Sequence, residues 1–131
     1  MVLLGIVFAS QCFIFPYRLA IGNGSSMSPS YNSGDISIAE KHFTDLKKGD
    51  VIAFQVGRDG MFIEHRIIRV LNETFLTKGD NNEYDDQALF ERYFGTAYLP
   101  LERVKSRTVY SIPRAAIFWS FLFSFQQTFV V

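Results

Sequence analysis

The central part of the chain, residues 21–112, alternates between short apolar runs and turns, as antiparallel β-proteins do. The strands expected from this pattern are residues 35–39, 51–56, 61–71, 74–77 and 104–112. Residues 57–60 (GRDG) separate two of these strands and suit a hairpin turn, because Gly and Asp tolerate positive φ. The pattern therefore predicts a mainly β fold, an antiparallel β-sheet domain that forms a sandwich or a partial barrel.

An apolar run precedes this domain. Residues 2–17 contain no charged side chain, and Pro16 and Arg18 mark the end of the run. A membrane-spanning helix needs about 20 mostly apolar residues, with a lower limit of roughly 17. We interpret residues 1–20 as an N-terminal membrane helix that anchors the domain, with a buried core helix as the alternative. A cleaved signal peptide is not indicated, because a basic start and a small-residue cleavage site are missing.

A second apolar run follows the domain at residues 115–125, and more polar residues follow it in turn. This run is short for a membrane span. Residues 115–131 would approach the length of a span if Gln126 and Gln127 were tolerated. We therefore expect the C-terminal segment, residues 113–131, to contact the membrane as a span, a lipid-facing hairpin or an interfacial aromatic helix.

Composition and charge exclude several classes of protein. A chain of 131 residues is large enough for one core and not for two. Its 13 basic and 13 acidic residues balance, so the sequence offers no basic patch for nucleic acid. The single cysteine, Cys12, excludes an internal disulfide and a zinc site built on paired cysteines.

Three stretches of the domain carry groups that acyl transfer requires: residues 24–29, 64–66 and 78–86. A serine such as Ser26 becomes a nucleophile when a neighbouring base takes its proton, and a histidine such as His65 is a side chain that can serve as this base near neutral pH. A carboxylate from the 80–86 loop would orient that histidine. Each stretch also has a structural interpretation, as a turn serine, a half-buried strand histidine, and a turn with solvated charges or a weak cation site.

Four motifs in this order resemble those of type I signal peptidases over residues 20–112. They are residues 26–29 (SMSP), 33–36 (SGDI), 48–54 (KGDVIAF) and 76–82 (LTKGDNN). Residues 65–67 (HRI) stand where bacterial and mitochondrial signal peptidases have a lysine base before an arginine, so the chain is similar to the endoplasmic-reticulum and archaeal branch. A histidine base suits this position because it needs little shift in pKa to act near neutral pH.

The resemblance implies a role for each matching residue. Ser26 would be the nucleophile and His65 the general base, with Asp86 as the third member and Asp80 as the alternative. The N–H of Ser26 would be the main oxyanion donor. Ser25, Met27 and Pro29 would assist the oxyanion site or bind substrate. No metal or organic cofactor is implied.

The resemblance also implies a function. We expect a serine endopeptidase at the extracytoplasmic or lumenal membrane surface that cleaves signal peptides from translocated preproteins after small residues, in an Ala-x-Ala-like pattern. Its expected partners are preprotein signal peptides, membrane lipid and accessory subunits of a signal peptidase complex. The alternatives are a processing peptidase with a narrow substrate range and a non-catalytic subunit that binds signal peptides. A self-cleaving repressor-type peptidase would want a lysine base and a DNA-binding segment, and the sequence shows neither.

Overall fold

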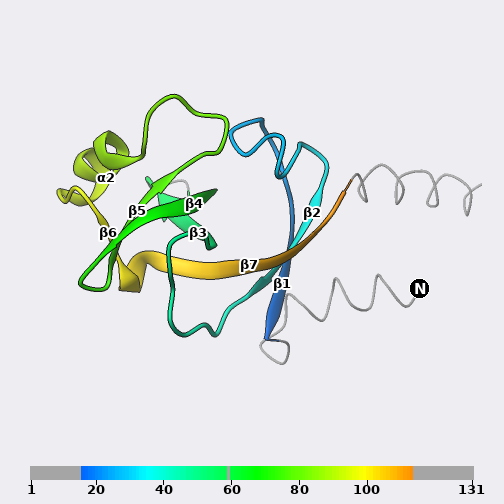
Figure 1. Ribbon diagram of the computed structural model, residues 1–131, viewed down its shortest axis with the longest axis horizontal. Coiled ribbons are helices and arrows are strands. Elements are labelled where there is room, and N and C mark those ends of the chain that lie inside the picture. The colour runs from blue at the N-terminus through cyan, green and yellow to red at the C-terminus, as the bar shows by residue number, and fades with distance from the viewer. Residues whose placement is uncertain (1–15, 59, 114–131) are drawn as a thin grey trace, which may run out of the picture.

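The computed structural model describes residues 16–58 and 60–113 (Figure 1). Within these two ranges, no helix is long and apolar enough to cross a membrane. The membrane helix expected in the first 20 residues falls largely outside the described part, as does nearly all of the apolar segment 113–131. Residues 17–20, which we assigned to the anchor, belong instead to a strand of the sheet.

The described residues form a seven-stranded sheet in which every pairing is antiparallel, with the order β1-β2-β7-β3-β4-β5-β6. The strands are β1 (Tyr17–Ile21), β2 (Ile36–Glu40), β3 (Val51–Val56), β4 (Met61–Leu71), β5 (Thr74–Lys78), β6 (Leu99–Pro100) and β7 (Val104–Ile112). The prediction of a mainly β, antiparallel fold is therefore confirmed. All five strands expected from the sequence are present within one residue of their predicted ends, and residues 57–60 connect β3 to β4.

Strand β7 joins the two halves of the molecule. Its C-terminal part pairs with β2, while its N-terminal part pairs with β3. In Figure 1, β7 runs from the end that holds β6 and α2 to the end that holds β1 and β2. The pairing with β2 shifts register between Ile38 and Ala39, and the pairing with β3 shifts between Ala53 and Phe54. Such irregularities increase local twist and allow a sheet to curve.

The sequence pattern missed the α-helix α2 (Gln87–Phe94), the 3₁₀ turn Leu101–Arg103 and the short strands β1 and β6. Helix α2 is only eight residues long, too short for a clear helical period. It ends at Gly95, whose φ of 70° is the left-handed conformation that closes many helices. Phe90 is the buried residue of this helix, so tertiary packing rather than intrinsic propensity holds α2 in place.

One face of the sheet carries the hydrophobic core, which α2 covers. The buried core residues are Ile52, Phe54, Val56, Ile67, Phe75, Leu76, Phe90, Leu99 and Val104. The rings of Phe54 and Phe90 meet edge to face, with their centroids 5.3 Å apart. Full burial of a side chain of this size contributes about 1.5–3 kcal/mol, so this face supplies most of the apolar stabilisation.

Small side chains line part of the opposite face of the sheet, beside larger ones such as Tyr31 and Phe62. Ala20, Ser37, Ala39, Ala53 and Ser106 come from β1, β2, β3 and β7, and all five line a groove of about 480 Å³. Because side chains alternate across a strand, Ala53 points into the groove while its neighbour Phe54 points into the core. The fold thus separates a packed face from a hollow face.

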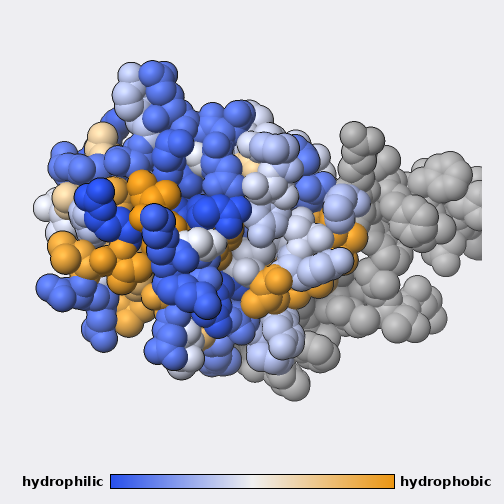
Figure 2. Space-filling model, in the orientation of Figure 1, coloured by the Kyte–Doolittle hydropathy of each residue, from blue (hydrophilic) through white to orange (hydrophobic). Residues whose placement is uncertain are grey.

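The outer surface in view is mostly hydrophilic (Figure 2). Hydrophobic side chains gather there at the end of the molecule that holds β5 and β6. Exposed apolar residues in this region include Val70, Leu71 and Leu101.

Candidate active site

Ser26 lies in the loop between β1 and β2, at one end of the groove. Main-chain hydrogen bonds close the base of this loop: the N–H of Gly22 donates to Asp35 O at 2.8 Å, and the N–H of Gly34 donates to Gly22 O at 3.0 Å. Gly24 has a φ of 103°, which side-chain-bearing residues rarely adopt, so the turn before Ser26 depends on glycine here. A closed loop of this kind holds the serine hydroxyl in a defined direction.

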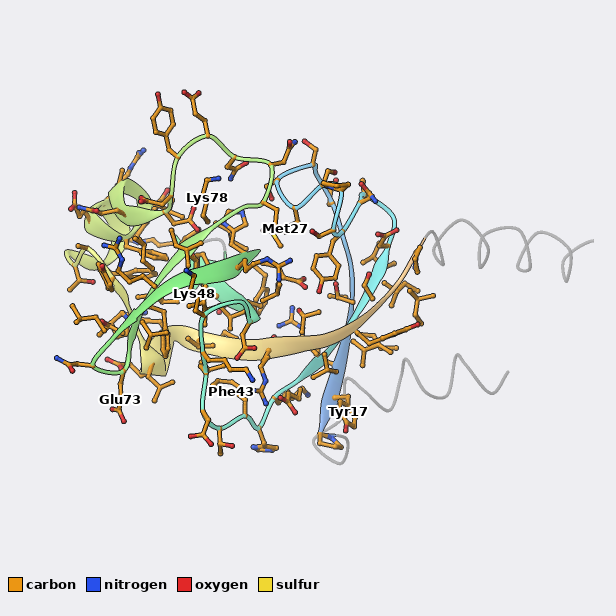
Figure 3. All side chains as sticks on the ribbon, in the orientation of Figure 1. Tyr17, Met27, Phe43, Lys48, Glu73 and Lys78 are labelled. Carbon is orange, nitrogen blue, oxygen red and sulfur yellow. The ribbon has the colours of Figure 1, made fainter. Side chains whose placement is uncertain are left out.

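Met27, the next residue of the same loop, fixes the loop to the rest of the protein. It is buried, and its sulfur accepts a hydrogen bond from the N–H of Asp80 at 3.4 Å. Figure 3 shows Met27 between the loop that follows β1 and the loop that follows β5. The apolar residue after Ser26 therefore ties the serine loop to the second loop of the site.

The loop after β5 forms hydrogen bonds with the backbone at Ser25 and Ser26. The N–H of Asn81 donates to Ser26 O at 2.8 Å, and the side-chain amide of Asn81 donates to Ser25 O at 3.1 Å. A Cβ atom at Gly79 would lie 2.7 Å from Ser26 O, closer than side chains approach a backbone oxygen, so the two loops can meet only with glycine at 79. The sequences SMSP and GDNN thus form one structural unit, although 49 residues lie between them.

Ser26, His65 and Asp86 form a hydrogen-bonded chain. The Oγ of Ser26 lies 3.2 Å from Nε2 of His65, and Nδ1 of His65 lies 2.7 Å from Oδ2 of Asp86. His65 and Asp86 are each only 6% exposed. With its proton on Nδ1, the imidazole donates to the carboxylate and leaves Nε2 free to accept from the serine hydroxyl. This is the arrangement that nucleophilic serine chemistry requires.

His65 is held in place by strand β4 and by the core. It pairs with Ile52 across the β3–β4 ladder, and its ring meets the ring of Phe54 edge to face, with the centroids 6.3 Å apart. His65 is therefore a buried histidine, unlike the half-buried strand histidine of the structural interpretation. Its imidazole lies where the core face meets the end of the groove.

Asp86 stands at the N-cap position of α2, yet its side chain makes no capping hydrogen bond. Its Oδ2 accepts instead from His65 and from the hydroxyl of Thr77, at 2.5 Å for the threonine. The preceding Asp85 accepts from the N–H of Gln87 at 3.0 Å and so satisfies one of the first helical donors. Thr77 was missed at the sequence level, because a threonine in a strand is indistinguishable from an ordinary β-former.

Asp80, the alternative third residue, contacts Arg66 instead of His65. Arg66 holds both carboxylate oxygens, with Nε at 3.0 Å from Oδ1 and Nη2 at 2.8 Å from Oδ2, and its Nη1 donates to Gly49 O at 2.9 Å. The hydrogen bond from Arg66 lowers the pKa of Asp80 and raises the pKa of Arg66. The pair links β4, the loop after β5 and the turn before β3.

The remaining predicted residues divide between the groove and the surface. Met27 lines the groove, whereas Ser25 and Pro29 are exposed and lie outside its lining. Ser25 contributes main-chain contacts, since its carbonyl accepts from the N–H of Ser28 at 3.1 Å. Pro29 follows a cis peptide bond.

The groove leads away from Ser26 between two strand edges. Among the described residues, β1 pairs only with β2, and the part of β4 before Arg66 pairs only with β3. The guanidinium of Arg18 on β1 lies 3.8 Å from the ring centroid of Phe62 on β4, so side chains of the two edges are in contact at this point. Burial lowers the pKa of Arg18 against the opposing effect of Glu64, and burial raises the pKa of Tyr31 on the groove wall. An extended peptide could hydrogen-bond to edges of this kind.

Residues 16–58 and 60–113 contain no group of three or more His, Cys, Asp or Glu side chains placed to hold a metal ion.

Comparison with known proteins finds similarity over most of the described residues. The family model described as Peptidase S24-like matches residues 16–95, which include all three residues of the hydrogen-bonded chain. The signal peptidase complex catalytic subunit SEC11C of Homo sapiens is 40% identical over 73 residues, which cover 50% of this chain and 38% of that protein.

Two further relatives are also named as signal peptidase complex catalytic subunits. The signal peptidase complex catalytic subunit SEC11 of Lodderomyces elongisporus is 29% identical over 102 residues, covering 68% of this chain and 61% of that protein. SEC11 of Eremothecium gossypii is 39% identical over 72 residues, which cover 51% of this chain and 43% of that protein. The chain thus spans less than two thirds of the length of each of these relatives. The resemblance to signal peptidases drawn from the four motifs is confirmed.

Proposed function

Because the chain belongs to the Peptidase S24-like family, we propose that it is a serine endopeptidase that cleaves signal peptides from translocated preproteins. The observation that carries the proposal is the hydrogen-bonded chain from Ser26 through His65 to Asp86. The relatives support the same activity, since they are named as catalytic subunits of a signal peptidase complex.

In the proposed mechanism, Nε2 of His65 accepts the proton of the Ser26 hydroxyl as Oγ attacks the scissile carbonyl. The Nδ1–H of His65 donates to Asp86, which stabilises the imidazolium that forms. The oxyanion is met by the N–H of Ser26, on a turn that Gly24 makes accessible. The imidazolium then protonates the leaving amine, and a water activated by His65 hydrolyses the acyl-enzyme.

The groove supports the substrate class. Its floor of Ala20, Ser37, Ala39, Ala53 and Ser106 is made of small side chains, so an extended peptide can lie close to the sheet between the edges of β1 and β4. Cleavage after small side chains, in an Ala-x-Ala-like pattern, is part of this proposal and rests on the resemblance to signal peptidases. The same groove would also serve a peptidase dedicated to a few exported proteins, which is the narrower version of this proposal.

A non-catalytic, peptide-binding subunit is the second candidate. It requires the groove and makes no demand on the positions of Ser26, His65 and Asp86. Their spacing at 3.2 Å and 2.7 Å therefore favours the enzyme. The proposed partners are preprotein signal peptides and, by analogy with the named complex of the relatives, accessory subunits.

We place the active site at a membrane surface on the extracytoplasmic or lumenal side. The support for a membrane surface is the uncharged run at residues 2–17, which leads into β1, together with the apolar run at residues 115–125, just after β7. The side of the membrane follows from the proposed substrate, a translocated preprotein. Both runs would bring lipid close to the strands that border the groove.

The experiment that tests the proposal compares the purified full chain in detergent with its Ser26→Ala variant on a preprotein substrate. We expect cleavage at the signal peptide junction by the unmodified chain and a loss of several orders of magnitude in the variant, with the fold intact by circular dichroism. Ser25→Ala, one residue away, is the matched control and should be much milder. Cleavage by Ser26→Ala at the original rate would exclude Ser26 as the nucleophile.

A further inference from the structure

Asp86 would ordinarily cap the helix that it precedes. Asp at an N-cap accepts hydrogen bonds from the first helical N–H groups. In this chain the side chain of Asp86 makes no such bond and points away from α2 toward His65. Something other than the helix must therefore hold this carboxylate in its orientation.

Thr77, at the end of β5, makes two contacts with Asp86. Its hydroxyl donates to Oδ2 of Asp86 at 2.5 Å, and its main-chain carbonyl accepts from the N–H of Asp86 at 2.9 Å. The two bonds fix both the backbone and the carboxylate of Asp86 relative to the sheet. Thr77 itself is held by its pairing with Ile67 on β4, the strand that also carries His65.

The same carboxylate oxygen serves both neighbours, since Oδ2 accepts from Nδ1 of His65 as well as from Thr77. Two donors on one oxygen define its direction in a way that a single donor does not. Thr77 is 0% exposed and is not among the residues that line the groove, so its hydroxyl has no access to a bound peptide. Any effect of Thr77 on the reaction must pass through Asp86.

We propose that Thr77 is a positioning residue for the Ser26–His65–Asp86 site: its buried hydroxyl aims the carboxylate of Asp86 at Nδ1 of His65. The inference rests on the proposed function for its effect on rate, and on geometry alone for its effect on the histidine. Without the hydroxyl, a buried carboxylate loses one donor and can rotate toward the N–H groups at the start of α2. His65 then loses the partner that fixes its tautomer.

The test uses the purified full chain in detergent and the variants Thr77→Val and Thr77→Ser. Valine keeps the shape and removes the hydroxyl, whereas serine keeps the hydroxyl. We expect kcat on a preprotein peptide to fall on the order of tenfold or more in Thr77→Val, as for a lost hydrogen bond to a charged group, with KM unchanged. Thr77→Ser should retain most of the activity.

A second readout does not depend on cleavage. An imidazole N–H bonded to a carboxylate gives a low-field signal in the proton NMR spectrum, and the signal of His65 can be assigned by its loss in His65→Gln. It should persist in Thr77→Ser and disappear or move in Thr77→Val. Ile67→Val, at the position paired with Thr77, is the matched control because it trims the core without touching Asp86. It should leave both kcat and the signal unchanged.

The outcomes separate this inference from the proposed function. A folded Thr77→Val variant with unchanged kcat and an unchanged His65 signal would overturn the positioning role while leaving the peptidase intact. A rise in KM at constant kcat would overturn it too, because it would indicate contact with substrate. Loss of the signal in Thr77→Val, in a protein that cleaves no preprotein, would support the positioning of Asp86 and contradict the peptidase. If Thr77→Val does not fold, Thr77→Ala replaces it and must show the loss that Thr77→Ser avoids.

Discussion

The two faces of strand β3 have different roles, one in the hydrophobic core and the other in the groove. Ile52, Phe54 and Val56 point into the core, where Phe54 is 0% exposed and packs against Phe90 of α2. Ala53, between them, points into the groove. One strand therefore contributes stability on one side and an open space on the other, and the period of two in a β-strand makes this division possible.

The difference between the two faces shows where the stability of the sheet comes from. A methyl or hydroxymethyl side chain contributes little to folding, so a groove floored by Ala39, Ala53 and Ser106 is stable only because the other face is well packed. His65 lies at the junction, with its ring against Phe54 and its Nε2 directed at Ser26. The core thus positions the imidazole as well as stabilising the sheet.

Phe54→Ala should have the largest effect on stability. Removal of this ring leaves a cavity next to Phe90 and His65, and we expect a loss of about 3–5 kcal/mol in the free energy of unfolding. Chemical denaturation of the full chain measures this loss. A variant nearly as stable as the original would mean that the core face is not the source of stability that the comparison requires.

Ala53→Leu tests the hollow face. Leucine would fill part of the groove, so we expect kcat/KM on a preprotein peptide to fall on the order of tenfold, chiefly through KM. Because Ala53 is buried, the added bulk should also cost about 1–3 kcal/mol in the free energy of unfolding. Ala88→Leu adds the same bulk at an exposed position on α2 and serves as the control. Equal activity in the two variants would show that peptide does not lie over Ala53.

Asp80→Asn should have the smallest effect on the free energy of unfolding, and it tests the ion pair between Asp80 and Arg66. Arg66 lowers the pKa of Asp80, so the ion pair stabilises the folded chain above the ordinary carboxyl pKa of about 3.9 and this stabilisation is lost as the pH falls through the lowered value. Because the pair is partly exposed, we expect Asp80→Asn to cost about 1 kcal/mol or less at pH 7. Denaturation at several pH values should show the difference shrinking below about pH 4.

Asp86→Asn provides the contrast for that measurement. An amide in place of this carboxylate disturbs the tautomer of His65, so activity should drop by orders of magnitude while the pH dependence of stability assigned to Asp80 remains. Should Asp80→Asn instead be the more damaging change for activity, with both proteins folded, Asp86 would not be the third member of the site.

Much of the sheet could be read from local patterns. The alternation in residues 35–39 and the apolar run at 51–56 depend on near neighbours, and both appear as strands in the structure. The hairpin expected around residues 57–60 is matched by the antiparallel pairing of β3 with β4. Strand β1 could not be read in this way, because its residues adjoin the apolar run at 2–17 and become a strand only by pairing with β2. Helix α2 likewise depends on the contact between Phe90 and Phe54.

By itself, the sequence determined the β fold and the groups available for chemistry, since strand period, turn residues and the motifs around Ser26 and His65 are local. Only the tertiary structure decided which carboxylate lies against His65. Asp80 and Asp86 occupy one loop, and the register of β5 directs Asp80 to Arg66 and Asp86 to His65 and Thr77. The reason is physical: a hydrogen bond requires atoms within about 3 Å, and residues far apart in the chain reach that distance only when the sheet has formed.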